Sequence, residues 1–192
     1  MWRRLVEAWS RPRGYRPGAT LARLRSDWPG LEGEAASAAE QSFAFPHGVW
    51  SFLVRERVEA GWMAHLVACE FCLSLPVSDP VPARIRLRHR GAWRRQGVAV
   101  DLLAGDAVRL APLLQALRAD ADVRAALMPL DFRRCELRGG VDGWSLLIEP
   151  FGASEVVCLL PPLRRYIRLG PIQRLALLAS MAACRRVLLA LN

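Results

Sequence analysis

The chain has 192 residues, of which 53% are hydrophobic and 23% charged, and its net charge is +9. These are globular values, and the length suits one domain with its own core, with barely enough residues for two. All 27 basic residues are arginine, which excludes a lysine-dependent phosphate loop. An all-arginine chain rich in Ala, Gly, Pro and Leu is typical of a GC-rich genome, so the charge is a weaker functional signal than its size suggests. Arginine nevertheless binds phosphate and carboxylate bidentately.

The five cysteines indicate a reducing compartment. Their number is odd and most lie within apolar runs, which favours free, buried thiols over a disulfide framework. The stretch after Met1 is too short and too charged to be the apolar core of a signal peptide. We therefore expect a cytoplasmic, bacterial-type protein.

The first residues predict a short amphipathic helix with Trp2, Leu5, Val6 and Trp9 on one side. One interpretation is a peripheral membrane contact made by Trp2, Arg3, Arg4 and Trp9. The other, which we favour, is a terminal helix packed on the domain or on a second subunit, because so short a helix binds membranes weakly. Pro and Gly residues then mark a linker. We predict an N-terminal segment at 1–18 and a single α+β domain at 19–192.

The next stretch predicts a helix, then a hairpin. Leu21, Leu24 and Trp28 define one side of a helix that begins at Ala19–Thr20 and stops at Pro29–Gly30. Residues 31–41 are alanine-rich and predict a further helix. Alternation over 50–58 and an apolar run over 62–75 then predict two paired strands.

The clearest strand runs from Ala83 to Arg90. Its arginines, at every second position, share one face, and Ile85 and Leu87 lie on the other. A turn at 91–97 leads to a returning strand at 98–102. If the two pair, parity places Val98, Val100 and Leu102 on the core face and Asp101 on the arginine face.

The remaining elements complete an α+β pattern. Helices are predicted at 106–117, where Asp106 is the cap, and at 120–127; strands are predicted at 131–137, 144–149 and 156–160. Residues 163–169 lead into a long helix at 171–192. We predict an antiparallel sheet of about six to seven strands packed on a long, largely buried C-terminal helix, with additional N-terminal and central helices.

The C-terminal helix is apolar nearly all round, which is typical of a core helix or a membrane span. Arg185 and Arg186 interrupt the apolar run, so no transmembrane segment is expected. One layer comprises Leu175, Leu178, Ala182 and Leu189, and the other Leu177, Met181, Cys184 and Leu188. Arg174 and Arg185 share a narrow polar edge with Gln173 and Ser180. We expect the sheet on one layer and, on the other, the 106–117 helix, a second subunit or a ligand.

Residues that could perform catalysis or bind metal are scattered. In Cys69-Glu70-Phe71-Cys72 the two thiols would point to opposite faces of a strand, which favours core thiols over a redox or zinc site. His47, His65 and His89 share no ligand or catalytic spacing. We therefore predict no catalytic residues, metal site or cofactor, and do not expect an enzyme.

Two basic groups are candidate binding sites. The first follows the 83–90 strand and its turn, where alternate arginines repeat every ~6.6–7 Å and an aromatic offers a stacking surface: Arg84, Arg86, Arg88, Arg90, Trp93, Arg94 and Arg95. The second precedes and enters the last helix and is a candidate ligand or anion site: Arg164, Arg165, Tyr166, Arg168 and Arg174. For both, a solvated surface partly neutralised by Asp101 and other carboxylates is the favoured interpretation.

These features predict a non-enzymatic binding module that holds a partner protein, a second copy or an apolar ligand at the C-terminal helix. The first alternative is nucleic-acid or polyanion binding through the Arg84–Arg95 ribbon. The second is peripheral membrane association through residues 1–16.

Overall fold

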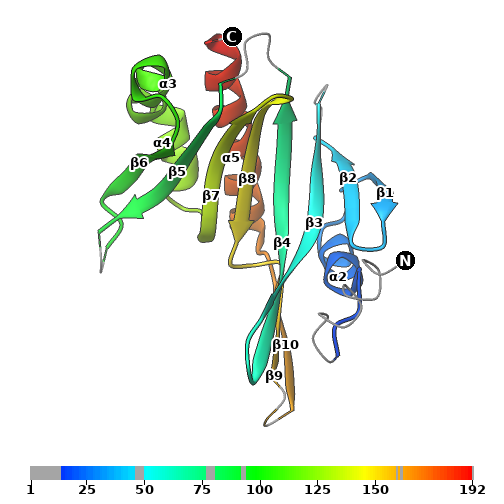
Figure 1. Cartoon of the computed structure of the whole chain (residues 1–192). Coiled ribbons are helices and arrows are strands. Elements are labelled where there is room, and N and C mark those ends of the chain that lie inside the picture. Colours follow the sequence, from blue (N-terminus) through cyan, green and yellow to red (C-terminus); the bar gives the residue numbers. More distant parts are fainter. Residues whose placement is uncertain are drawn as a thin grey trace, which may run out of the picture.

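The computed structural model describes residues 14–45, 50–76, 81–91, 94–158, 160 and 162–191. Within these residues, ten strands form one antiparallel sheet that is accompanied by four helices (Figure 1). The predicted α+β class, the antiparallel sheet and the C-terminal helix are therefore confirmed. The sheet has more strands than the six to seven that were predicted.

The elements follow the chain in this order: α2 (Ala19–Asp27), β1 (Gly33–Ser37), β2 (Glu40–Ala44), β3 (Ser51–Ala60), β4 (Ala64–Leu75), β5 (Ala83–Arg90), β6 (Gly97–Ala104), α3 (Ala107–Ala119), α4 (Ala121–Leu127), β7 (Phe132–Gly140), β8 (Gly143–Pro150), β9 (Ser154–Cys158), β10 (Leu163–Ile167) and α5 (Pro171–Ala190).

The sheet is organised around β4, its longest strand. The strand order is β1-β2-β3-β4-β8-β7-β5-β6. The second half of β4 pairs with β8, and its first half pairs with β9, which in turn pairs with β10. The ends of β3 and β4 therefore form, with β9 and β10, an arm that extends beyond the main sheet (Figure 1).

Two segments differ from the sequence-based expectation. The helix expected at 31–41 was wrong, because these residues form the β1–β2 hairpin at one end of the sheet. Phe43 on β2 is fully buried and stacks on Phe52 of β3 at 5.9 Å, so tertiary pairing overrides the helix preference of the alanines. Residues 163–167, expected to be a connection, form β10 instead.

All four helices contribute buried side chains to one hydrophobic core, together with the inward residues of the sheet. The Asp106 carboxylate accepts hydrogen bonds from the N–H groups of Val108 and Arg109 at the start of α3, as predicted for a cap. Asp120 caps α4 in the same way. The helices are thus fixed over one face of the sheet, and the opposite face carries mainly polar side chains.

The predicted parity of the β5–β6 hairpin is confirmed. Ile85 lies opposite Leu102 and Leu87 opposite Val100, and Ile85, Leu87 and Val100 are buried in the core. Arg86 lies opposite Asp101 on the polar face. The alternation that is visible in the sequence therefore orients every arginine of β5 away from the helices.

One apolar layer of α5 forms part of the core. Leu177, Met181, Cys184 and Leu188 are buried, as expected. Ser180 is also buried and donates a hydrogen bond to the carbonyl of Ala176, so its predicted place on a polar edge was wrong. The hydroxyl satisfies its own hydrogen bond within the helix, which lets it face the core.

The second layer of α5 lies partly against α4 and is partly exposed. Arg186 of α5 pairs with Asp120 and Asp122 at the start of α4. A groove of ≈ 540 Å³ runs between the two helices, and Ile172 and Leu175 at its rim are 72% and 70% exposed. Among the described elements, no helix is long and apolar enough to cross a membrane.

Candidate functional site

The four arginines of β5 project from the polar face, and three of them lie near carboxylates. Arg84 donates two hydrogen bonds to Glu136, at 3.2 and 3.0 Å, and Arg88 donates one to Asp101 at 2.6 Å. Arg86 lies 4.0 Å from Glu136, at the limit of an ion pair. For Arg90 the described residues provide no carboxylate partner. This row is therefore partly neutralised, as the solvated-face interpretation predicted.

Three glutamates that were not predicted as site residues are buried among these arginines: Glu70 on β4, Glu136 on β7 and Glu149 on β8. Their carboxylates lie on the polar face, where guanidinium groups cover them. Burial of a carboxylate is costly unless it is paired and hydrogen-bonded. Each of the three is paired with at least two arginines.

The pairing forms one continuous network across β3, β4, β8, β7 and β5. Glu136 is contacted by Arg84, Arg86, Arg134 and Arg138. Glu70 is contacted by Arg55, Arg57 and Arg134, and Glu149 by Arg57 and Arg133. We call this surface the arginine-rich face; it comprises Arg55, Arg57, Arg84, Arg86, Arg88, Arg90, Arg133, Arg134 and Arg138, with Glu70, Glu136 and Glu149 beneath them.

The electrostatics of this network keep its groups ionised. Burial acts to raise the pKa of Glu136, but hydrogen bonds from Arg134, Arg84 and Arg138 outweigh it and lower that pKa to about 2. The hydrogen bond to Glu149 raises the pKa of Arg57. Even when Glu59, which pairs with Arg57 and Arg133, and Asp101, which pairs with Arg88, are included, arginines outnumber carboxylates here, so the face keeps a positive excess at neutral pH.

The sheet opens within the arginine-rich face, between β5 and β7. The two strands pair from Ala83–Gly139 to Arg86–Glu136, with no registered pair beyond that point among the described residues. A cleft of ≈ 550 Å³ occupies this opening, and Figure 1 shows the two strands diverging there. Its lining combines guanidinium groups from three strands with the strand ends: Arg57, Arg84, Arg86, Leu87, Arg88, His89, Phe132, Arg133, Arg134, Cys135, Glu136 and Glu149.

The chemistry that this cleft can perform is binding of an anion. The six guanidinium groups of the lining offer up to five N–H donors each, together more than its two carboxylates, Glu136 and Glu149, can accept. His89 hydrogen-bonds through Nε2 with the carbonyl of Leu127 and packs on Phe132 at 4.5 Å. Burial raises the pKa of the Cys135 thiol well above its usual value, so it is a poor nucleophile. The described cleft residues therefore offer donors and charge, without a paired nucleophile and base.

The turn after β5 is only partly described. Trp93 lies outside the described residues, and so do Trp2, Arg3, Arg4 and Trp9 of the proposed membrane contact. Arg94 is exposed. Arg95 pairs with Asp131 and donates a hydrogen bond to the Met128 carbonyl at 2.7 Å, which ties the turn to the segment after α4.

The second predicted group is divided among different partners. Arg164 pairs with the buried Glu155, which also binds Arg23, and Arg168 pairs with Asp27. Arg174 donates to the Leu169 carbonyl and lies 5.5 Å from the Trp28 ring.

The other two members of this group also differ from each other. Arg165 is exposed, whereas Tyr166 is half-buried; burial, and then the nearby Asp27 carboxylate, raise the pKa of its hydroxyl. Shared neighbours nevertheless link several of the five: Arg23, which pairs with Glu155, lies 5.7 Å from the Tyr166 ring, and Asp27 acts on both Arg168 and Tyr166. None of the five lines the β5–β7 cleft or the groove between α4 and α5.

The Cys69–Cys72 pair has the arrangement expected for core thiols. Cys69 is buried on the helix side of β4, and Cys72 is half-buried on the polar side; both are free. Burial raises the pKa of both thiols, that of Cys72 to about 11. The described residues contain no cluster of three His, Cys, Asp or Glu side chains that could hold a metal ion.

The chain belongs to the family described as "Protein of unknown function (DUF3156)", which matches residues 26–188. A comparison with curated proteins found no match, and a comparison with solved structures found none either. The family match spans every strand that carries the arginine-rich face.

Proposed function

We propose that this chain is a non-enzymatic binding module that holds a polyanion on the arginine-rich face. The ligand class that this surface suits best is single-stranded nucleic acid. The observation that carries the proposal is the excess of guanidinium groups around Glu70, Glu136 and Glu149, on a face that the described helices leave uncovered. The five free thiols support a cytoplasmic location.

The buried carboxylates give this face a specific physical property. They hold the guanidinium groups in fixed positions, so less side-chain entropy is lost when an anion binds. Charge-assisted hydrogen bonds from the arginines offset the free-energy cost of burying each of these glutamates. The result is a rigid array of donors rather than a set of freely moving arginines.

The spacing of β5 suits a chain of phosphates. Alternate residues of a strand lie ~6.6–7 Å apart, which is close to the phosphate spacing of an extended single strand. Arg86 and Arg90 have the weakest internal pairing of the row. They are therefore the guanidinium groups most available to phosphate. Recognition would be through the backbone of the ligand, with little dependence on sequence.

The test is fluorescence anisotropy of a labelled single-stranded oligonucleotide titrated with the full chain. The double variant Arg86→Ala with Arg90→Ala should bind about tenfold more weakly, because each removes a phosphate contact. The matched control is the double variant Arg16→Ala with Arg25→Ala, which removes the same two charges at exposed positions on or just before α2, away from the arginine-rich face. Equal loss in both variants would show that overall charge, not this face, determines binding.

A partner protein at the C-terminal helix remains a second proposal, supported by the groove between α4 and α5. The side chains beneath α5 are tightly buried, so an apolar ligand would have to displace them, whereas Ile172 and Leu175 already face outward. We propose a second copy of the chain as the occupant. Sedimentation should then show a dimer that Leu175→Glu dissociates, and a monomer at every concentration would remove this proposal.

A further inference from the structure

The last strand of the sheet, β6, has a main-chain edge that faces outward. β6 ends the strand order beside β5. The N–H of Gln96 donates to the Arg90 carbonyl, so the main-chain groups of Arg90, and by alternation those of Arg88 and Arg86, point toward β6. The main-chain groups of Ala99 and Asp101, which lie opposite Arg88 and Arg86, point back toward β5.

The intervening residues Val98, Val100 and Leu102 therefore direct their N–H and C=O groups away from the sheet. A second observation agrees: the Arg118 side chain donates a hydrogen bond to the Val100 carbonyl at 2.9 Å, from outside the sheet. This contact uses one outward group. We call the outward main-chain groups of Val98, Val100 and Leu102 the β6 edge.

A groove of ≈ 570 Å³ follows the β6 edge. Five consecutive residues of β6, from Gly97 to Asp101, line it. Four arginines surround them, and they come from β5, α3 and α4: Arg88, Arg90, Arg118 and Arg124. Asp101 is the carboxylate of this lining, and Arg88 pairs with it. The groove is therefore strongly positive beside a row of outward main-chain donors and acceptors, one of which Arg118 occupies.

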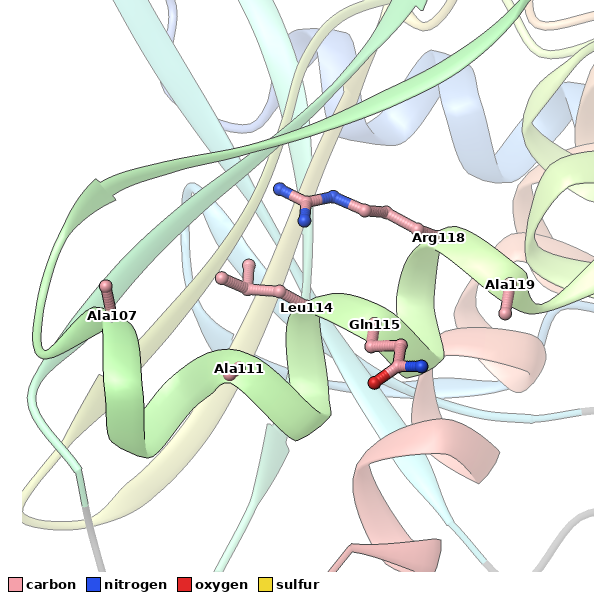
Figure 2. A pocket seen from close by; sticks show the side chains of 6 residues that line it. All are labelled: Ala107, Ala111, Leu114, Gln115, Arg118 and Ala119. Carbon is pink, nitrogen blue, oxygen red and sulfur yellow. The ribbon is translucent and has the colours of Figure 1, made fainter.

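On the helix side, the groove meets a second, more apolar depression of ≈ 600 Å³. Small and apolar residues of α3 line it, including Ala107, Ala111 and Leu114. Arg118 lines both grooves, and Figure 2 shows it extending from α3 on the same side as Leu114. An added strand would thus have an apolar neighbour on one of its faces and Arg88 and Arg90 on the other.

We propose that the β6 edge binds an extended, acidic segment of a partner protein by strand addition. Main-chain hydrogen bonds to Val98, Val100 and Leu102 would provide affinity, and alternate side chains would provide selectivity. Acidic side chains face Arg88 and Arg90, and apolar ones face the α3 groove. Before binding, Arg118 shields the open edge by its hydrogen bond to the Val100 carbonyl. On binding, it leaves this carbonyl and pairs with a carboxylate of the incoming segment.

The probe is a capped eight-residue peptide of alternating Val and Glu, which matches β6 in length. A peptide of the same composition with Val and Glu in two blocks is the control for charge. Two further versions of the alternating peptide carry backbone N-methyl groups, one at every Val and the other at every Glu. In an added strand, only one of these two sets of N–H groups faces β6.

We expect the alternating peptide to bind the full chain about tenfold more tightly than the block peptide. One N-methylated version should lose binding and the other should retain it, because methylation blocks main-chain hydrogen bonds without changing charge. Similar affinity of all four peptides would overturn the proposal, since charge alone would then account for binding. Absence of binding by the alternating peptide would overturn it as well.

Protein variants separate this site from the arginine-rich face. Arg124→Glu should weaken peptide binding about tenfold, because the described contacts of Arg124 are with a carbonyl rather than a carboxylate. Arg25→Glu, with the same charge change on α2, should leave peptide binding unchanged. Arg86→Ala should weaken oligonucleotide binding and spare the peptide. If Arg86→Ala weakened peptide binding and Arg124→Glu did not, the assignment of the peptide site to the β6 edge would be contradicted.

Discussion

Replacement of Glu136 by Gln tests whether the arginine-rich face is a stabilising network. Glu136 is 1% exposed, and its pKa is lowered from 4.5 to about 2 by the surrounding arginines. Because the folded pKa lies below the unfolded one, the stabilisation is fully present above about pH 4.5. It is lost as the pH falls through about 2. Glu136→Gln keeps the shape of the side chain and removes its titration.

The size of the effect follows from the shift and from solvent screening. A change from 4.5 to about 2 corresponds to at most ~3.4 kcal/mol of unfolding free energy. The side chains of Arg84, Arg86 and Arg138 are 43–47% exposed, so water screens part of this interaction. We therefore expect Glu136→Gln to destabilise the fold by ~1–2 kcal/mol at pH 7.

Urea unfolding followed by tryptophan fluorescence at pH 7 and near pH 2 provides the measurement. The difference between the natural chain and Glu136→Gln should be present at pH 7 and nearly absent near pH 2. Asp101→Asn is the control, because its single pair with Arg88 is exposed and should contribute less than ~1 kcal/mol. A difference of the same size at both pH values would refute the electrostatic explanation.

Three further predictions concern the core and the backbone. Leu177→Ala should destabilise the fold by ~3 kcal/mol through a buried cavity, whereas Leu175→Ala on the exposed side of α5 should cost less than ~0.5 kcal/mol in the same urea assay. Gly18→Ala should be clearly more destabilising than Gly30→Ala by thermal unfolding. Both glycines have φ near +80°, but at Gly18 a Cβ would clash with the carbonyl oxygen of Ala38, and at Gly30 it would meet nothing. Burial lowers the pKa of His65 from 6.5, and the positive charge of a nearby arginine lowers it further. The stabilisation of the fold by the neutral imidazole is therefore lost as the pH falls below about 6.5. His65→Leu should flatten the loss of stability between pH 7 and pH 5, and an unchanged pH profile would contradict that origin.

The β5–β6 hairpin could be predicted because strand parity is a local property. Ile85 and Leu87 alternate with arginines, and this period of two fixes which face each side chain occupies, whatever the strand pairs with. The cap at Asp106 is equally local. The buried layer of α5 was also visible, since a helical wheel requires no knowledge of the neighbouring elements.

The buried glutamates could not be found in this way, because their environment is made by strands far apart in the sequence. Glu70 meets Arg55 and Arg134, and Glu149 meets Arg57 across a separation of 92 residues. A lone Glu within each of the apolar strands β4 and β8 was the available signal, and Glu136 had only the neighbouring arginines of β7 to mark it. Its meaning depended on the strand order, which the sequence left open.

The same reason explains the two wrong or missing elements. Residues 31–41 have the composition of a helix, but their place at the end of the sheet favours the β1–β2 hairpin. Residues 163–167 have no strong alternation, and pairing with β9 makes them a strand. In both cases a neighbour that is contributed by another part of the chain decides the local structure.

The salt dependence of oligonucleotide binding tests the proposed function most directly. The dissociation constant of a labelled single-stranded oligonucleotide should be measured with the full chain across a series of salt concentrations. Three or four guanidinium–phosphate contacts at about 0.7 each predict a slope of log affinity against log salt of roughly −2 to −3. Binding that is absent at low salt, or a slope near zero, would contradict the assignment of the arginine-rich face as a polyanion-binding surface.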